Sequence, residues 1–119
     1  MKVQITGKGM ELTEAIKEYA TKKAEALNKF YNDRIIRAEI VVGINNAHHR
    51  KGDMFMAEYK LDVPGQNLFA VKQEENLYKA IDQVRDQLES ELKKYKRKQR
   101  VSEKDKKVGR KNKEYQVEI

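Results

Sequence analysis

Apolar residues recur at helical spacing between Asn76 and Arg100, and this stretch predicts the longest helix of the chain. Its apolar positions follow one another at steps of three or four: Leu77, Ile81, Val84, Leu88, Leu92 and Tyr95. Neither proline nor glycine interrupts the stretch, and Asn76 stands where an N-cap residue accepts a backbone N–H. Full burial of these side chains contributes on the order of ten kcal/mol before entropy is counted. Loss of Leu88 or Ile81 should therefore be among the most damaging single changes.

A second helix and four strands are predicted ahead of this one. Thr13 is the predicted N-cap of a helix that runs to about Tyr31 and carries apolar residues on one side. Alternation of apolar and polar residues predicts strands over 2–6, 36–44 and 55–63. Pro64-Gly65 is a turn signal, and a short fourth strand over 67–72 follows it. The polar stretch over 45–53 is predicted to be a loop.

The predicted order β-α-β-β-β-α indicates an α+β fold. Three consecutive strands joined by short links favour antiparallel pairing. Each strand has one apolar face and each helix one apolar stripe, so both helices should pack on one face of a four-stranded sheet. Residues 1–100 should form this domain, and residues 101–119, which lack a sustained apolar stripe, should form a basic, flexible tail.

The composition indicates the cellular compartment in which the protein is expected. At 119 residues the chain fits one compact domain plus a tail. It has no cysteine, so it has no disulfide framework and no thiol nucleophile. No apolar run approaches the roughly 20 residues that span a membrane, and the start MKVQITGKG lacks the apolar stretch of a signal peptide. We expect a cytoplasmic protein that does not associate with membranes by insertion.

The net charge of +7 is concentrated at the C-terminal end. Through Leu92, 14 Lys or Arg oppose 15 Asp or Glu, whereas from Lys93 onward 12 basic residues oppose four acidic ones. Such an end favours polyanionic partners, with nucleic acid first and an anionic membrane second. A tail that only increases solubility is the alternative interpretation.

No arrangement of residues predicts catalysis, a cofactor or a metal. The carboxylates alternate with lysines as ordinary ions of a helix surface do, and no glycine-rich loop of the phosphate-binding kind is present. His48 and His49 are adjacent, and no third ligand accompanies them at a suitable spacing, so a surface loop is the expectation there. We expect a protein that is not an enzyme.

Two segments of the chain read VQITGKGMELTEAIKEYATKKAEALNKFY and VPGQNLFAVKQEENLYKAIDQVRDQLESELKKYKRK. They resemble the ribosome hibernation-promoting factor family, also called ribosome-associated inhibitor or protein Y. The resemblance covers residues 1–100 and implies a fold similar to double-stranded-RNA-binding domains, which recognise RNA by shape and phosphate contacts. It also implies a short-type factor, without the C-terminal domain by which long members bring two ribosomes together.

The resemblance further implies a function and a partner. Members of the family bind the small ribosomal subunit in the channel used by mRNA and tRNA, contact rRNA there and exclude both ligands. They inhibit translation under starvation or stress, including stationary phase. We expect a monomer that acts in this way and uses no cofactor.

Cationic side chains of the two helices are the candidate rRNA contacts, because Lys and Arg neutralise phosphates without reading sequence. The candidates are Lys22, Lys23, Lys29, Lys79, Arg85, Lys93, Lys94, Lys96, Arg97 and Lys98. The resemblance supports Lys23 and Lys29, with Lys22 beside them, and Lys94 and Lys96. An ordinary solvated helix face is the alternative.

The chain departs from the family that it resembles at two further positions of the second helix. Many relatives carry Lys near position 87 and Arg near position 90, where this chain has Gln87 and Ser90. Either the RNA-facing side of this helix contacts RNA in a different way from the relatives, or its RNA contacts are shifted toward the end of the helix.

Aromatic residues are weaker candidates for stacking on bases. Four of them fall on predicted core faces: Tyr19, Phe30, Tyr59 and Tyr95. Tyr31 and Tyr78 are the better candidates for exposure. Two other function classes stay open, namely a general structured-RNA-binding module without ribosome preference and an interaction protein whose cationic tail recruits an acidic partner.

Overall fold

A computed structural model describes the backbone of residues 1–45 and 54–111 and the side chains of residues 1–44 and 54–97. The elements are β1 (Lys2–Lys8), α1 (Glu14–Phe30), β2 (Arg37–Asn45), β3 (Met54–Val63), β4 (Gln66–Glu74) and α2 (Leu77–Lys111). The predicted α+β order β-α-β-β-β-α is confirmed. The loop that contains His48 and His49 lies outside the described residues.

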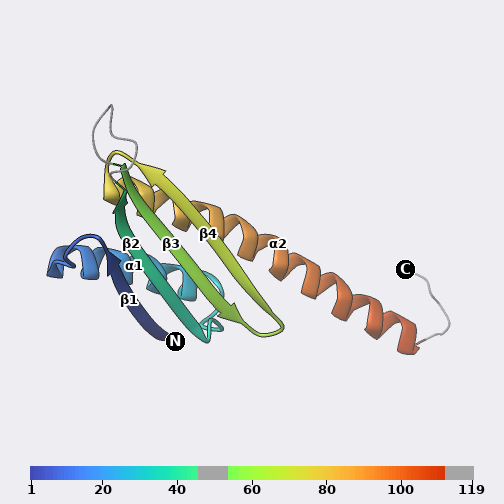
Figure 1. Cartoon of the computed structure of the whole chain (residues 1–119). Coiled ribbons are helices and arrows are strands. Elements are labelled where there is room, and N and C mark those ends of the chain that lie inside the picture. Colours follow the sequence, from blue (N-terminus) through green and yellow to red (C-terminus); the bar gives the residue numbers. More distant parts are fainter. Residues whose placement is uncertain (46–53, 112–119) are drawn as a thin grey trace.

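The four strands form one sheet in the order β1-β2-β3-β4 (Figure 1). β2 pairs with β3, and β3 with β4, in antiparallel register, as their short connections predict. β1 pairs with β2 in parallel register, and α1 supplies the crossover that a parallel pair requires. Both helices lie on the same face of the sheet, where one row of the register runs from Ile5 through Ile40 and Tyr59 to Ala70.

The core is the apolar layer between the sheet and the two helices. The α2 stripe is buried as predicted, with Leu77 only 5% exposed and Ile81, Val84, Leu88 and Leu92 fully buried. β2 and β3 contribute every second residue to the same layer: Ala38, Ile40, Val42, Ala57, Tyr59, Leu61 and Val63. This alternation confirms the two strongest strand predictions.

The start of the second strand differs from its prediction. Ile36 precedes β2 and is 58% exposed, whereas its neighbour Ile35 is buried. The Ile35 N–H donates to Asn28 Oδ1 at 2.9 Å, and the Ile36 N–H donates to the Asp62 carbonyl at 2.8 Å. These bonds hold the connection so that Ile35, and not Ile36, faces the core.

The ends of α1 are fixed by local chemistry. Thr13 Oγ1 accepts from the Ile16 N–H at 3.2 Å, which confirms the predicted N-cap. At the other end Asn32 and Asp33 adopt positive φ values of 61° and 59° and reverse the chain. This reversal directs Tyr31 into the core, where it is only 1% exposed, so the prediction that Tyr31 is exposed is wrong. Tyr78, in contrast, is 39% exposed as predicted.

α2 is longer than its apolar stripe predicts. Asn76 Oδ1 accepts from the Tyr78 N–H at 2.8 Å and starts the helix as expected. The helix then passes Arg100 and ends at Lys111, projecting beyond the sheet (Figure 1). Residues 98–108 contain neither proline nor glycine and are rich in lysine, which favours helix. That residues 101–119 form a flexible tail stays a prediction.

A hydrogen bond joins α2 to the turn between β3 and β4. Tyr95 Oη donates to the Pro64 carbonyl at 2.7 Å. Gly65 has a φ of 87°, which favours glycine. A Cβ atom at Gly65 would lie 2.8 Å from Tyr95 Oη, so any other residue at position 65 would require the Tyr95 hydroxyl to shift.

Tyr59 makes the fold sensitive to alkaline pH. Its hydroxyl is buried under α1 and donates to the Ala20 carbonyl at 2.8 Å, and burial raises the pKa of Tyr59 far above its ordinary value of 10.0. Above pH 10 the unfolded chain therefore loses this proton while the folded chain keeps it, so stability is full below pH 10 and falls as the pH rises further.

Replacement of Tyr59 by Phe should remove this part of the pH dependence. At pH 7 Tyr59→Phe should lose about 1 kcal/mol, the typical net worth of one hydrogen bond. Between pH 10 and 11 the free energy of unfolding of the wild type should fall by up to about 1.4 kcal/mol more than that of the variant. The stability advantage of the wild type at pH 7 should therefore disappear at pH 11. Urea unfolding from pH 7 to pH 11 measures both. Parallel stability curves for the two proteins would contradict the assignment.

Candidate nucleic-acid interface

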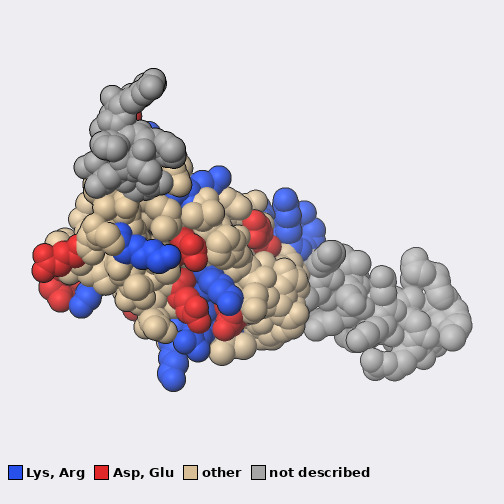
Figure 2. Space-filling model, in the orientation of Figure 1, with Lys and Arg blue, Asp and Glu red and all other residues tan. Residues whose placement is uncertain are grey.

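The predicted cations at the end of the α2 stripe are accessible. Lys93, Lys94 and Arg97 are exposed, and none of them has an ion pair with another described residue. Figure 2 shows a group of basic side chains on α2 beside the undescribed residues, whereas basic and acidic side chains alternate over the body. Lys98 continues the α2 backbone, but its side chain lies outside the described part of the chain. We call Lys93, Lys94, Lys96 and Arg97 the terminal cation cluster.

Lys96 differs from the rest of the terminal cation cluster. It is half-buried, its Nζ donates to the Phe30 carbonyl at 3.2 Å, and the same atom lies 5.3 Å from the centre of the Phe30 ring. Lys96 thus ties α2 to the last turn of α1. The sequence assigned Phe30 to the core, and the structure shows it half-buried at the rim. Phe30 is the last residue of α1, and a position at the end of a helix could have indicated that its side chain lies at the edge of the core.

On α1, Lys22 and Lys29 are exposed and have no ion pair within the described residues. Lys29 lies in the last turn, where a cation also complements the helix dipole. Both side chains are therefore available to a partner, and Lys29 lies on the α1 end that packs against α2.

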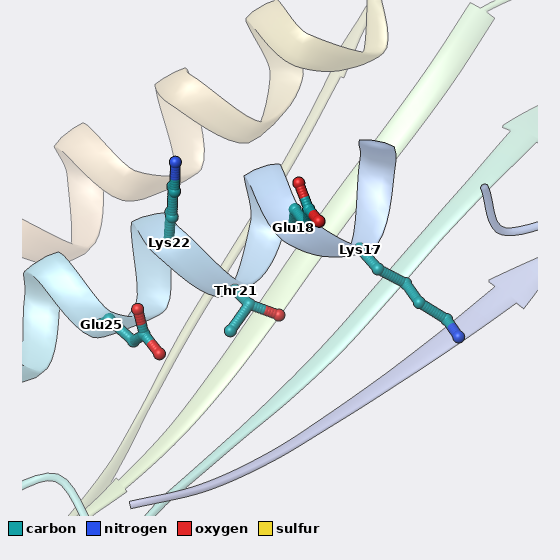
Figure 3. Close-up of a pocket in the computed structure, with 5 residues that line it drawn as sticks. All are labelled: Lys17, Glu18, Thr21, Lys22 and Glu25. Atoms are coloured by element: carbon teal, nitrogen blue, oxygen red, sulfur yellow. The ribbon is translucent and has the colours of Figure 1, made fainter. Parts of the chain in front are cut away.

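Lys22 also borders a shallow depression on α1 of about 270 Å³. Figure 3 shows that the Lys22 and Glu18 side chains point to one side of the helix, and those of Lys17, Thr21 and Glu25 to the other. The lining carries both signs of charge, and the side chains diverge. This depression therefore lacks the convergent polar groups of a ligand site.

Lys23 is bound within the protein instead. Its Nζ lies 3.4 Å from Asp82 Oδ1 and 5.0 Å from the centre of the Tyr19 ring. Tyr19 Oη donates to the same Asp82 oxygen at 2.6 Å, and this hydrogen bond, together with burial, raises the pKa of Tyr19. The three side chains connect α1 to α2. Lys23 is thus less available to RNA than Lys22 or Lys29.

Arg85 and Lys79 are also paired. Arg85 contacts Asp86 at 2.9 Å and Glu89 at 3.1 Å, and its buried Nε has no hydrogen-bond partner among the described residues. Lys79 lies 3.9 Å from Glu74. Surface pairs of this kind contribute little to stability, but they reduce the positive field that each cation presents.

The positions at which the chain departs from the family that it resembles lie on a nearly neutral flank of α2. Gln87 Nε2 donates to Glu91 Oε2 at 3.1 Å, and Ser90 is exposed. This flank therefore offers RNA no cation until Lys94. That contacts are shifted toward the helix end stays a prediction, and the arrangement is compatible with it.

The arrangement as a whole is suited to binding a polyanion. Exposed cations lie on both helices of a body in which acidic and basic residues are almost equal in number, and they concentrate where α2 leaves that body. Within the residues described, no group of His, Cys, Asp or Glu side chains could hold a metal ion, and no helix is long and apolar enough to cross a membrane. Attraction between cationic side chains and phosphates requires neither a bound metal ion nor a membrane-crossing helix.

Comparisons with known proteins agree with this fold. The family model described as sigma 54 modulation protein / S30EA ribosomal protein matches residues 3–100. A ribosome hibernation promoting factor of Escherichia coli K12 is 32% identical over 96 residues, which cover 81% of this chain and 94% of the relative. The factor of the same name from Pseudomonas putida is 28% identical over 99 residues, with 83% and 90% covered. The crystal structure of the Thermus thermophilus Protein Y N-terminal domain superposes with a TM-score of 0.69 at 29% identity, covering 80% of this chain and 99% of that one.

Proposed function

The chain belongs to the sigma 54 modulation protein / S30EA ribosomal protein family, and on that premise we propose that it binds the small ribosomal subunit in the channel used by mRNA and tRNA. Bound there, it excludes both ligands and inhibits translation under starvation or stress. It acts in the cytoplasm as a monomeric regulator rather than an enzyme. Its relatives from E. coli and P. putida carry the name ribosome hibernation promoting factor, which supports this assignment.

The observation that carries the proposal is the unpaired part of the terminal cation cluster. Lys93, Lys94 and Arg97 have no acidic partner among the described residues, although the body through Leu92 carries almost equal numbers of acids and bases. Unpaired cations release counterions when they meet phosphates, which supplies affinity without a sequence code. The cluster anchors the protein electrostatically, and the compact body then blocks the channel by its bulk.

A competition experiment on ribosomes tests this function. Purified protein should co-sediment with small subunits at low salt and dissociate as the salt concentration rises, because its affinity depends on phosphate contacts. Preloading the subunits with mRNA and initiator tRNA should reduce the bound protein, and excess protein should in turn release both ligands. Absence from the small-subunit fraction at low salt would refute the proposal.

Controls in the same experiment separate the two alternatives. Unrelated duplex RNA should compete weakly if the ribosome is the target, and it should compete as well as ribosomes if the protein is a general structured-RNA-binding module. Deletion of residues 101–119 should leave most of the ribosome binding intact, since the anchor proposed here lies before that segment. Complete loss of binding on deletion would favour an interaction protein that acts through its tail.

A further inference from the structure

Two hollows meet at Phe30, where the last turn of α1 lies against α2. The larger, of about 400 Å³, is lined by Ala26, Leu27, Lys29 and Phe30 of α1 and by Arg85 and Glu89 of α2. The smaller, of about 270 Å³, is lined by Phe30 and by Lys93, Lys96 and Arg97 of α2. Apart from the neighbours Lys96 and Arg97, the α2 residues recur at steps of three and four, and all five lie along one side of that helix. We call the two hollows together the Phe30 groove.

The charge of the Phe30 groove selects an anion. Its lining contains five cations and a single acid, Glu89. Glu89 Oε1 already accepts from Arg85 Nη1 at 3.1 Å, which leaves Lys29, Lys93 and Arg97 exposed and without an ion pair among the described residues. A phosphate in the smaller hollow would meet cations from more than one turn of α2.

The aromatic ring distinguishes this groove from an ordinary basic helix face. Phe30 packs against the core and still borders both hollows. Lys96 holds the ring and a cation together, since its Nζ both donates to the Phe30 carbonyl and lies over the ring. Proteins that bind single-stranded nucleic acid combine these two elements, with bases stacked on aromatic rings and phosphates bound by nearby cations.

We propose that the Phe30 groove holds one unpaired nucleotide of an RNA strand. The base lies against Phe30 in the larger hollow, where Ala26 offers apolar surface, and a phosphate lies between Lys93 and Arg97 in the smaller one. A base inside a regular A-form helix is stacked and paired and does not reach such a site, so the groove selects bulges, loops or strand ends. The inference rests on the proposed function and names the RNA element that this surface takes.

A pair of Phe→Leu variants tests the stacking contact. Phe30→Leu keeps apolar packing and removes the ring, whereas Phe69→Leu makes the same change at a 53% exposed position on β4. Affinity is measured for two RNA hairpins, one with a single bulged 2-aminopurine and one fully paired. Phe30→Leu should weaken binding to the bulged hairpin about five- to 150-fold, the range for loss of one stacked base. Its affinity for the paired hairpin, and both affinities of Phe69→Leu, should match wild type.

A second measurement uses the wild-type protein, so it does not depend on the folding of a variant. With 5-bromouridine at the bulge, irradiation should crosslink the RNA to the tryptic peptide 30–34, which begins at Phe30. Crosslinking to other peptides alone would overturn the proposal, as would equal binding of the bulged hairpin by wild type and Phe30→Leu. Displacement of the bulged hairpin by AMP at equal concentration would instead assign the groove to free nucleotides and overturn the RNA assignment.

These outcomes are separable from failure of the proposed function. If wild type does not bind ribosomes but crosslinks to bulged RNA through peptide 30–34, the ribosomal proposal fails and the groove assignment stands. If wild type binds ribosomes and Phe30→Leu binds both ribosomes and bulged RNA equally well, the ribosomal proposal stands and the groove assignment fails.

Discussion

Charge reversal of Lys93, Lys94 and Arg97 together should lower the affinity for small ribosomal subunits about a hundredfold or more at 0.1 M salt. Each lost phosphate contact removes close to one unit from the dependence of log affinity on log salt, or roughly tenfold in affinity at that concentration. The three side chains are exposed and unpaired within the described residues, so the fold should tolerate the change. Lys96 stays unchanged because it holds Phe30. Co-sedimentation at several salt concentrations gives both the affinity and the slope.

A matched variant controls for net charge. Lys2, Lys8 and Lys60 are equally exposed, lie on strands and are absent from the proposed interface. Their reversal changes the net charge of the protein by the same amount. We expect at most a severalfold loss of affinity and an almost unchanged salt slope, since these residues act only at long range. Equal losses for the two triple variants would show that total charge, and not the terminal cation cluster, drives binding.

Replacement of Ile81 by Ala should destabilise the fold by about 2–5 kcal/mol, the range for loss of a large side chain from a packed core. Ile81 is fully buried in the apolar layer between α2 and the sheet, so the change leaves a cavity there. For a body of this size, such a loss lowers the midpoint of thermal unfolding by about 10 °C or more. Circular dichroism during heating and urea titration measures it.

Ile36 provides a control of identical chemistry. It is 58% exposed, and Ile36→Ala should change the stability by no more than about 0.5 kcal/mol, as most surface substitutions do. Leu88→Ala, in the same buried stripe as Ile81, should behave like Ile81→Ala. If Ile81→Ala and Ile36→Ala lose similar stability, the packing described for α2 is wrong.

The fold was predictable because periodicity and burial agree along most of the chain. The α2 stripe and the alternation in β2 and β3 each leave one arrangement that buries all apolar faces, and the structure has that arrangement. The family resemblance pointed to the same α+β fold, and the comparisons confirmed it. The failures lie where local geometry overrides pattern: the positive φ values of Asn32 and Asp33 bury Tyr31, and the bonds of the preceding connection expose Ile36.

The interface was less predictable than the fold. Charge in a sequence does not reveal pairing, so Lys23 stood among the candidates beside Lys93 until the structure showed Lys23 next to Asp82. The same limit applies to Arg85, whose acidic neighbours at positions 86 and 89 engage it. The Phe30 groove depends on how the end of α1 meets α2, a relation between segments more than fifty residues apart that periodicity does not encode.

The hydrogen bond between Tyr95 and the Pro64 carbonyl attaches α2 to the sheet at the end of the apolar stripe. Tyr95 is the last residue of the apolar stripe, and its hydroxyl is fastened to the hairpin tip, so the helix is clamped at the point where the sheet ends. Beyond this point α2 leaves the sheet and carries Lys96 and Arg97 of the terminal cation cluster. A side chain at residue 65 would displace Tyr95 Oη, so glycine at this position preserves the last attachment of α2 before those cations.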